Sequence, residues 1–448
     1  MIDLKTPINH TWQMMNIHSR LAALGIAVPD VLLPKNGTDL SKWAIIACDQ
    51  YTQDKSYWER AKSIVGNSPS SFNLIFPELY LENSDLNERA SRIEIIREAM
   101  KNYLNNGVFS SPRHAFIYLE RSTAHHPKRR GLIILVDLEQ YNWAPESRPL
   151  IRSTEGTVSE RLPPRIEIRR NAPLELPHII LLIDDEEDRL IPSLGEIAKK
   201  QPPLYQTPLM LNSGEICGWA LDGEKAWTIL AEGLEGLAVK AESRYGKNAS
   251  GESPFLFAVG DGNHSLATAK AVWEEYKREN AGKAIPDNHP ARWAMVELEN
   301  IYDPGISFEP IHRVLFGIEV QELIKILSVE DKIKCYRDIR RQNTHTENLI
   351  WIEGGSNEIV TASLEPLLDR IVKDRGLSID YIHGEDEVYR LASDTSKPAV
   401  GIILPPLEKD SLFKTVASSG PLPRKSFSMG HADEKRFYLE CRKLFEEA

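Results

Sequence analysis

The sequence predicts an α/β fold of the mixed α+β kind, with a mixed-sheet core and a smaller C-terminal α/β unit. Short apolar runs typical of buried strands alternate along the chain with amphipathic helical stretches. One such run, Phe255 to Val259, leads through a glycine turn directly into a helical pattern that contains Leu266, Ala269 and Trp273. The chain has 448 residues, 42% hydrophobic and 27% charged, which suits a globular protein of two or three domains.

Most of the expected elements lie in the first 317 residues. Strands are predicted at 43–48, 114–121, 130–138, 178–183 and 255–259, and helices at 85–106 and 224–245. The segments 114–121 and 130–138 alternate apolar and polar residues, so we expect them to pair around an exposed loop. The charged helix at 85–106 ends near Asn106-Gly107, which is a helix-stop signal.

The pattern changes near residue 318, where a smaller α/β unit is predicted. Short strands are expected at 348–352, 358–362 and 400–404, and helical stretches at 366–375 and 409–418. A charged helix is expected at 432–447. The sequence therefore divides into regions 1–317 and 318–448, with no long linker between them.

Charge and composition narrow the function classes. A net charge of −11 argues against a protein whose main ligand is nucleic acid. No apolar run approaches the roughly 18 residues of a membrane helix, and no secretory pattern opens the chain. The four cysteines are far apart and form no CxxC pair, which argues against a disulfide scaffold. We therefore expect a cytoplasmic protein with a small-molecule substrate and no membrane partner, and a homo-oligomer stays open.

The turn after the strand 255–259 is the most informative motif. It consists of Gly260, Asp261, Gly262, Asn263, His264 and Ser265. Glycine tolerates positive φ, and a helix that starts after such a turn directs free N–H groups and the positive end of its dipole at an anion. The turn therefore predicts a phosphate or carboxylate site. The plainer interpretation is ordinary helix capping.

Two further clusters are rich in groups that bind anions. The first spans 152–170 and contains Glu155, Thr157, Arg161 and Arg165. Arginine forks match phosphate oxygens, and Glu155 between two threonines can act as a base or metal ligand. The second spans 422–431 and contains Arg424, Lys425 and Ser426. A solvated strand edge and a surface loop are the plainer interpretations of these clusters.

Other motifs carry less information. His178 flanks an apolar strand, where a satisfied core histidine is usual, and Asp49 follows the strand at 43–48. The acidic run 184–188 is a solvated loop or an Mg²⁺ site. The sequence contains no HExxH, P-loop, protein-kinase, GxSxG or strong Rossmann motif.

Taken together, these clusters resemble the bacterial family known as domain of unknown function 1015. The matching segments are 43–52, 154–157, 161–165, 174–179, 260–270 and 423–430. They are spread over nearly the whole chain and agree in order. The resemblance identifies a family without implying an activity.

The glycine turn also resembles the Asp-Gly-His-His-Arg turn of the ParB/sulfiredoxin fold. Members of that fold include free-serine kinases, sulfiredoxins and the nucleotide-binding domains of chromosome-partition proteins. Asp261, Gly262 and His264 match, whereas Asn263 replaces a histidine and Ser265 replaces the arginine. Another arginine, such as Arg161 or Arg165, would have to clamp the phosphate. The resemblance implies a ParB/sulfiredoxin-like mixed-sheet core that binds nucleotide phosphates at a helix start.

This resemblance implies a small-molecule phosphotransferase that uses Mg²⁺ with ATP or ADP. Its sharpest form is a kinase of free serine or a similar hydroxy acid, with region 1–317 catalytic and region 318–448 closing the site. Glu155 would take the hydroxyl proton, with Asp49 as a second candidate, and Asp261 would hold Mg²⁺. Residues 260–265 with Arg161 and Arg165 would bind the nucleotide, and His264 would neutralise charge. Substrate binding is assigned to Thr157, His178, Arg424, Lys425 and Ser426.

Three alternatives stay open. A metal-dependent phosphomonoester hydrolase needs metal and water at the same site but no nucleotide. A regulatory or DNA-associated protein would bind nucleotide without turnover, although the acidic charge disfavours DNA. In a structural or interaction protein, the polar turn at 260–265 would only cap a helix.

Overall fold

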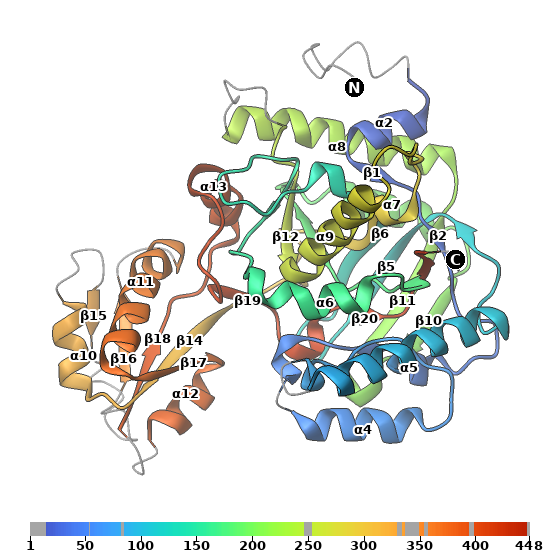
Figure 1. Ribbon diagram of the computed structural model, residues 1–448. Coiled ribbons are helices and arrows are strands. Elements are labelled where there is room, and N and C mark those ends of the chain that lie inside the picture. Colours follow the sequence, from blue (N-terminus) through green and yellow to red (C-terminus); the bar gives the residue numbers. More distant parts are fainter. Residues whose placement is uncertain are drawn as a thin grey trace. The chain divides into compact units, whose positions relative to one another are not determined.

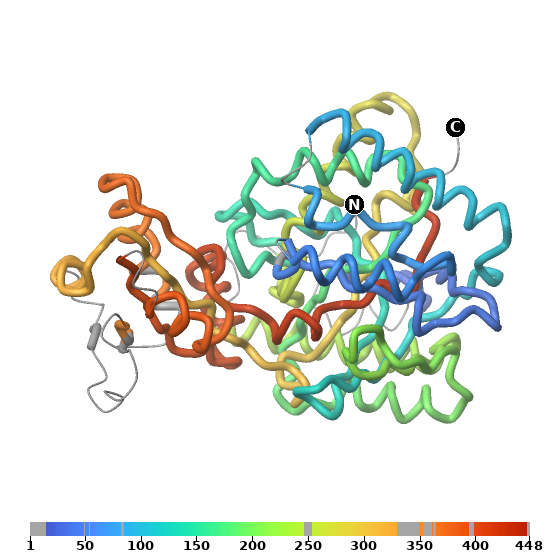
Figure 2. The backbone as a smooth tube through the Cα atoms, turned by 90° about the horizontal axis from the view of Figure 1, so that it is seen from below, coloured from blue at the N-terminus to red at the C-terminus, as the bar shows by residue number. Residues whose placement is uncertain are grey.

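The computed structural model describes residues 15–52, 54–81, 85–245, 253–328, 334–336, 349–353, 357–393 and 398–445. The chain forms two compact units. Unit 1 consists of Met1–Ser153, Thr157–Ile306 and Ala432–Ala448, and unit 2 of Thr154–Gly156 and Ser307–His431. The chain thus returns to unit 1 at its end, as the red segment in Figure 2 shows. The functional division at 317/318 stays a prediction.

Unit 1 is built on a nine-stranded mixed sheet (Figure 1). Its strands are β1 (Ile26–Ala27), β5 (Phe116–Ser122), β6 (Arg129–Asp137), β7 (Ile151–Ser153), β9 (Ile180–Ile183), β10 (Tyr205–Pro208), β11 (Glu215–Leu221), β12 (Phe257–Asp261) and β13 (Trp293–Asn300). Their order is β10-β11-β5-β6-β13-β9-β12-β7, and β1 pairs with β6. The β12–β7 and β13–β9 pairs are parallel, and β5 and β6 are antiparallel as predicted. The mixed α/β fold class is confirmed.

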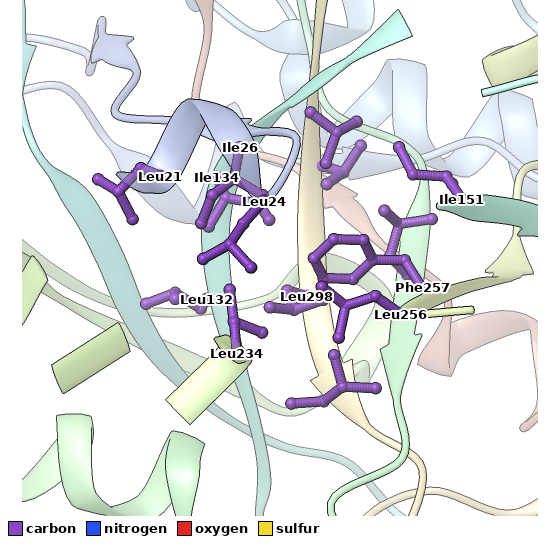
Figure 3. Close-up of a cluster of buried hydrophobic side chains, with 14 of the residues drawn as sticks. Leu21, Leu24, Ile26, Leu132, Ile134, Ile151, Leu234, Leu256, Phe257 and Leu298 are labelled. Carbon is purple, nitrogen blue, oxygen red and sulfur yellow. The ribbon is translucent and has the colours of Figure 1, made fainter. Parts of the chain in front are cut away.

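Apolar cores bury both faces of this sheet. Leu132, Ile134 and Val136 of β6 join one core, whereas Ile133 and Leu135 join the other, as the two-residue period of a strand requires. The first core is covered by α2 (Ile17–Ala23), α7 (Leu190–Ala198), α8 (Glu224–Tyr245) and α9 (Asn263–Glu279). The second is covered by α4 (Lys55–Val65) and α5 (Leu86–Asn105). Figure 3 shows how side chains from helices and strands fill the first core.

Unit 2 is a smaller α/β unit with a six-stranded sheet of order β15-β16-β18-β14-β17, in which β19 pairs with β14. The strands are β14 (Phe308–Phe316), β15 (Lys334–Tyr336), β16 (Leu349–Glu353), β17 (Ser378–His383), β18 (Ala399–Ile403) and β19 (Phe427–Met429). The helices are α10 (Val320–Leu327), α11 (Asn357–Arg375), α12 (Glu385–Ala392) and α13 (Lys409–Ser419). Leucines of α10 and α11 pack on the sheet, and Val388 of α12 belongs to a separate core.

Two predicted elements are wrong. The strand expected at 358–362 lies in α11, because Leu364, Leu367, Leu368 and Ile371 extend a helical apolar pattern that is buried against the sheet. The helix expected at 432–447 is largely extended. In it, β20 (Phe437–Tyr438) pairs with β3 (Ile45–Ile46), and β21 (Arg442–Lys443) pairs with β8 (Leu174–Glu175). No helix in the described ranges has the length and apolar character needed to cross a membrane.

Buried charges explain why the C-terminal segment is extended. Arg436, Glu440 and Arg442 are each at most 4% exposed. Nε of Arg436 lies 3.1 Å from Oε2 of Glu297 in β13, and its Nη2 donates to Glu440. A solvated helix would forfeit these partners, so tertiary ion pairing overrides the local helical pattern.

The sheet also holds the backbone at the start of this segment. Arg121 at the end of β5 donates to the carbonyls of Asp433, Glu434 and Lys435. Nη1 of Arg129, its partner across the β5–β6 pair, donates to the Glu434 carbonyl at 2.6 Å. We define these two arginines with Arg436, Glu297, Glu299 and Glu440 as the buried ion network.

We predict that Arg436→Leu lowers the free energy of unfolding of unit 1 by about 3–5 kcal/mol, because it removes the guanidinium that pairs with both buried carboxylates, Glu297 and Glu440. Urea denaturation followed by tryptophan fluorescence measures the loss. The control is Lys55→Ala, which removes an exposed pair with Glu59 (side chains 77% and 66% exposed) and should change stability by less than about 1 kcal/mol. Equal effects would contradict the structural importance of the network.

Candidate functional site

The predicted phosphate turn joins β12 to α9 in unit 1. Gly260 and Asp261 end β12, and Gly262 adopts φ +84° immediately before the first helical residue. An ideal Cβ at Gly262 would lie 3.1 Å from the Cα of Ile179, so both the backbone conformation and the packing require glycine here. Gly262 at the N-cap position has no side chain with which to cap this helix start. The first amides of α9 are therefore oriented to receive an anion.

Asp261 forms an ion pair rather than part of a carboxylate cluster. Its Oδ1 lies 3.3 Å from Nζ of Lys435, and Lys435 is 3% exposed. Among the described residues, no group of three or more His, Cys, Asp or Glu side chains can hold a metal ion. The assignment of Asp261 to Mg²⁺ stays a prediction.

His264 connects the helix start to the segment before α6 (Leu162–Arg169). Its Nε2 accepts a hydrogen bond from the Val158 amide at 3.2 Å. This bond requires an unprotonated Nε2, so the imidazole is neutral while it is made. The bond also brings Thr157, the residue before Val158, into the neighbourhood of the turn.

A pocket of about 180 Å³ in unit 1 brings three predicted residues together with residues that sequence analysis missed. Arg165, His178 and Ser265 line it, as do Glu78 and Tyr438. The rest of the lining consists of Arg169, Glu175 and Thr268 and of the apolar residues Leu74, Ile75, Phe76, Leu81, Met100, Ile168, Ala172, Leu174, Leu176, Ile179 and Met295. A concave apolar pocket with a few polar groups is typical of small-molecule sites.

The polar groups of this pocket are fixed by local contacts. The rings of His178 and Tyr438 are stacked, with centroids 5.7 Å apart and planes at 9°. Burial, and then the Glu78 carboxylate, raise the pKa of Tyr438, which therefore keeps its proton at neutral pH. Arg165 donates to Glu78 at 3.2 Å and to the carbonyl of Arg161, whose own side chain is exposed. Arg165 is thus part of the pocket wall.

Apart from Asp49, which belongs to unit 1, the remaining predicted residues lie in unit 2. Oε1 of Glu155 accepts from the Ser426 amide at 2.9 Å, and its Oε2 accepts from the Lys425 amide at 3.2 Å. Burial raises the pKa of Glu155 to about 7, although Lys425 and the surrounding amides act in the opposite direction. Arg424 lies 3.8 Å from Asp369 and is half exposed. Asp49 belongs to the 3-10 helix Asp49–Tyr51, and its side chain lies outside the described ones.

Lys435 and Tyr438 are the main residues that sequence reasoning missed. Both lie in the segment that was expected to form a helix. The apolar run Phe437 to Leu439 within a charged stretch was the available signal, because it fits a short buried strand.

Comparisons with known proteins agree on the family. The model of the family described as protein of unknown function (DUF1015) matches residues 32–443. The chain belongs to this family. A comparison with curated proteins found no match.

Three solved structures illustrate the distant similarities of this DUF1015-family chain. A conserved hypothetical protein from Pyrococcus furiosus is 11% identical, covers 66% of this chain and 90% of its own, and has a TM-score of 0.32. A free serine kinase in complex with AMP is 9% identical, with 70% and 92% covered and a TM-score of 0.35. SbnI with a C-terminal truncation, from Staphylococcus aureus, is 11% identical, with 70% and 87% covered and a TM-score of 0.33.

We predict that Gly262→Ala lowers the free energy of unfolding by more than the roughly 1–2 kcal/mol expected for the left-handed backbone alone. The added Cβ must also displace Ile179. Gly282→Ala is the matched control, because Gly282 has φ +87° and no atom within 4 Å of an added Cβ. Urea unfolding measures both variants. A loss no larger at Gly262 than at Gly282 would contradict the close packing of the turn.

Proposed function

We propose that this protein is a nucleotide-dependent kinase of a small hydroxy acid, and that free serine is the first substrate to test. The observation that carries the proposal is the helix start at Gly262, where the first amides of α9, the Lys435 ammonium paired with Asp261 and the pocket lined by Ser265 lie within unit 1. Phosphoryl transfer needs mostly positioning and charge stabilisation, which this set of groups supplies.

In this proposal the turn binds the phosphates of the nucleotide and the pocket binds its base. The first amides of α9 and the helix dipole bind the phosphates. In the ParB/sulfiredoxin-type motif an arginine supplies positive charge, and here Ser265 takes its position. We assign that charge to Lys435 instead. The pocket takes the base, because its apolar lining and the ring of Tyr438 suit a flat heteroaromatic group. His178 and Arg165 orient that group from the wall.

Asp261 is the residue that would hold Mg²⁺ beside the phosphates. Protein sites for this ion commonly provide one or two carboxylates, with the substrate phosphates and waters completing the shell. When bound, the ion would neutralise charge on the phosphate oxygens. Asp261 would then hold the ion in place of its ion pair with Lys435, and the Lys435 ammonium would bind the same phosphates.

Glu155 is the proposed general base. The O–H bond of the substrate breaks, its proton passes to the Glu155 carboxylate, and its oxygen bonds to the terminal phosphorus as the donor's bridging oxygen leaves with the nucleotide. A base with a pKa near 7 is well matched to this task at neutral pH. Thr157, Arg424, Lys425 and Ser426 are proposed to bind the substrate, and Asp49 stays the second candidate base.

We predict that ATP or ADP with Mg²⁺ raises the melting temperature of the wild-type protein in a thermal-shift screen that also contains CTP and GTP, each with and without L-serine. Lys435→Met should weaken nucleotide binding by about 10–100-fold, the equivalent of a lost charge-assisted hydrogen bond of about 1.5–3 kcal/mol.

Two controls accompany this screen. Lys443→Met removes an exposed lysine of the same segment and should leave the nucleotide shift intact. Lys435→Met combined with Asp261→Asn removes both partners of the ion pair and should bind no more tightly than Lys435→Met alone, because Asp261 is the proposed Mg²⁺ ligand. The absence of a shift with every nucleotide would overturn the kinase proposal.

We further predict that Glu155→Gln retains nucleotide binding within about threefold but lowers kcat by about 10²–10⁴-fold, the usual contribution of a general base. In the wild type, kcat/KM for serine should rise from pH 6 to pH 8 with an apparent pKa near 7, because deprotonation of Glu155 in the substrate-free protein generates the active form. Coupled-enzyme assays at saturating nucleotide, with serine varied from limiting to saturating concentrations, measure both effects. Unchanged turnover in Glu155→Gln would contradict the assignment.

A further inference from the structure

The turn Pro423–Phe427 in unit 2 wraps around a carboxylate. Oε1 of Glu155 accepts from the amides of Ser426 at 2.9 Å and Phe427 at 3.4 Å, and its Oε2 accepts from the amide of Lys425 at 3.2 Å. Three successive backbone N–H groups thus converge on one anion. Concave arrangements of this kind are recurrent anion-binding devices. We call these three amides the 425–427 nest.

The nest is held in a strained conformation. Lys425 adopts φ +59°, a region that non-glycine residues rarely occupy unless their surroundings enforce it. Nη2 of Arg313, which is fully buried, donates to the Lys425 carbonyl at 3.0 Å. Arg313 is fixed in turn by an ion pair with the buried Glu365 at 2.5 Å. Backbone strain that buried partners maintain is common at functional sites, so the conformation of Lys425 points to a functional role for this turn.

The carboxylate comes from a separate short segment. Thr154–Gly156 runs beside Leu422, with a 2.7 Å bond from the Leu422 amide to the Thr154 carbonyl and a 3.0 Å bond from the Gly156 amide to the Leu422 carbonyl. These backbone bonds secure the segment independently of its side chain. Because the backbone bonds of Thr154–Gly156 do not involve the Glu155 side chain, we expect this segment to stay in place when the carboxylate leaves the nest.

The positive charge at the nest comes from Lys425, whose attraction favours the ionised form of Glu155. Ser426 is fully buried, and its Oγ donates to the Pro423 carbonyl at 2.6 Å, which closes the turn. The side chain of Ser426 thus supports the turn, and its amide faces the anion. One ammonium and three amides match the size and charge of a single small carboxylate.

We propose that the 425–427 nest is a binding site for a small carboxylate, that Glu155 is its resident ligand, and that the carboxylate of the substrate enters by exchange with Glu155. The part that concerns the substrate rests on the proposed function. Exchange releases the Glu155 carboxylate from its three amide donors at the moment when a hydroxy acid is bound. Substrate binding thereby frees the base that takes the hydroxyl proton.

The test uses Glu155→Ala in the full chain, without nucleotide, and formate as the probe. Formate should raise the melting temperature of this variant by about 2–4 °C more than sodium chloride at equal ionic strength. The excess should be absent in the wild type and in Glu160→Ala, which removes an exposed carboxylate nearby in sequence. Adding Lys425→Ala to Glu155→Ala should remove most of the excess.

Equal formate shifts in Glu155→Ala and the wild type, or no excess over chloride, would overturn the proposal. If Glu155→Ala does not fold, Glu155→Gln replaces it, and hydrogen exchange at the amides of 425–427 is the readout. Formate should then slow exchange at these amides, and unchanged exchange would overturn the site. Because no nucleotide is present, failure here leaves the nucleotide screen unaffected, and failure of that screen leaves this result intact.

Discussion

The buried ion network fastens the C-terminal segment to the sheet of unit 1, and the candidate site depends on it. Arg121 and Arg129 hold the carbonyls of residues 433–435, and Arg436 lies against Glu297. Burying these charges is costly unless each has a partner, so the segment has few alternative placements. Lys435 and Tyr438 lie in the same segment, and Lys435 pairs with Asp261 of the predicted phosphate turn whereas Tyr438 lines the pocket. The network thus sets the position of two site residues without contacting a ligand.

We propose one backbone anion site in each unit, and the two sites differ in what occupies them. In unit 1, the proposed site is the start of α9, beside which Lys435 is paired with Asp261. In unit 2, the 425–427 nest is filled by Glu155. A nucleotide at the first site would compete with the Asp261–Lys435 ion pair. A carboxylate at the second must replace three hydrogen bonds, which favours a ligand that offers the same geometry as Glu155.

Local patterns predicted much of the fold, because they record which face of an element is buried. The helices at 85–106 and 224–245 and the start of α9 follow from helical periodicity and from glycine in the turn. The strands around 114–138 were expected from alternation, but residues 132–136 of β6 are apolar on both faces and bury both. The segment 432–447 was predicted wrongly because the partners of Arg436 and Glu440 are set by tertiary structure. Of the site, sequence located the turn and its pocket neighbours Arg165 and His178. Lys435 could not be found, because only the sheet arginines place it there.

The central claim is that a nucleotide binds at the start of α9 beside Lys435. Hydrogen–deuterium exchange of the wild-type protein, with and without ATP or ADP and Mg²⁺, tests it most directly. We expect slower exchange in peptides that cover residues 261–266 and 433–438, because the ligand would engage the turn amides and fix the segment that carries Lys435. Unchanged exchange in both segments, or protection confined to other parts of the chain, would contradict the account.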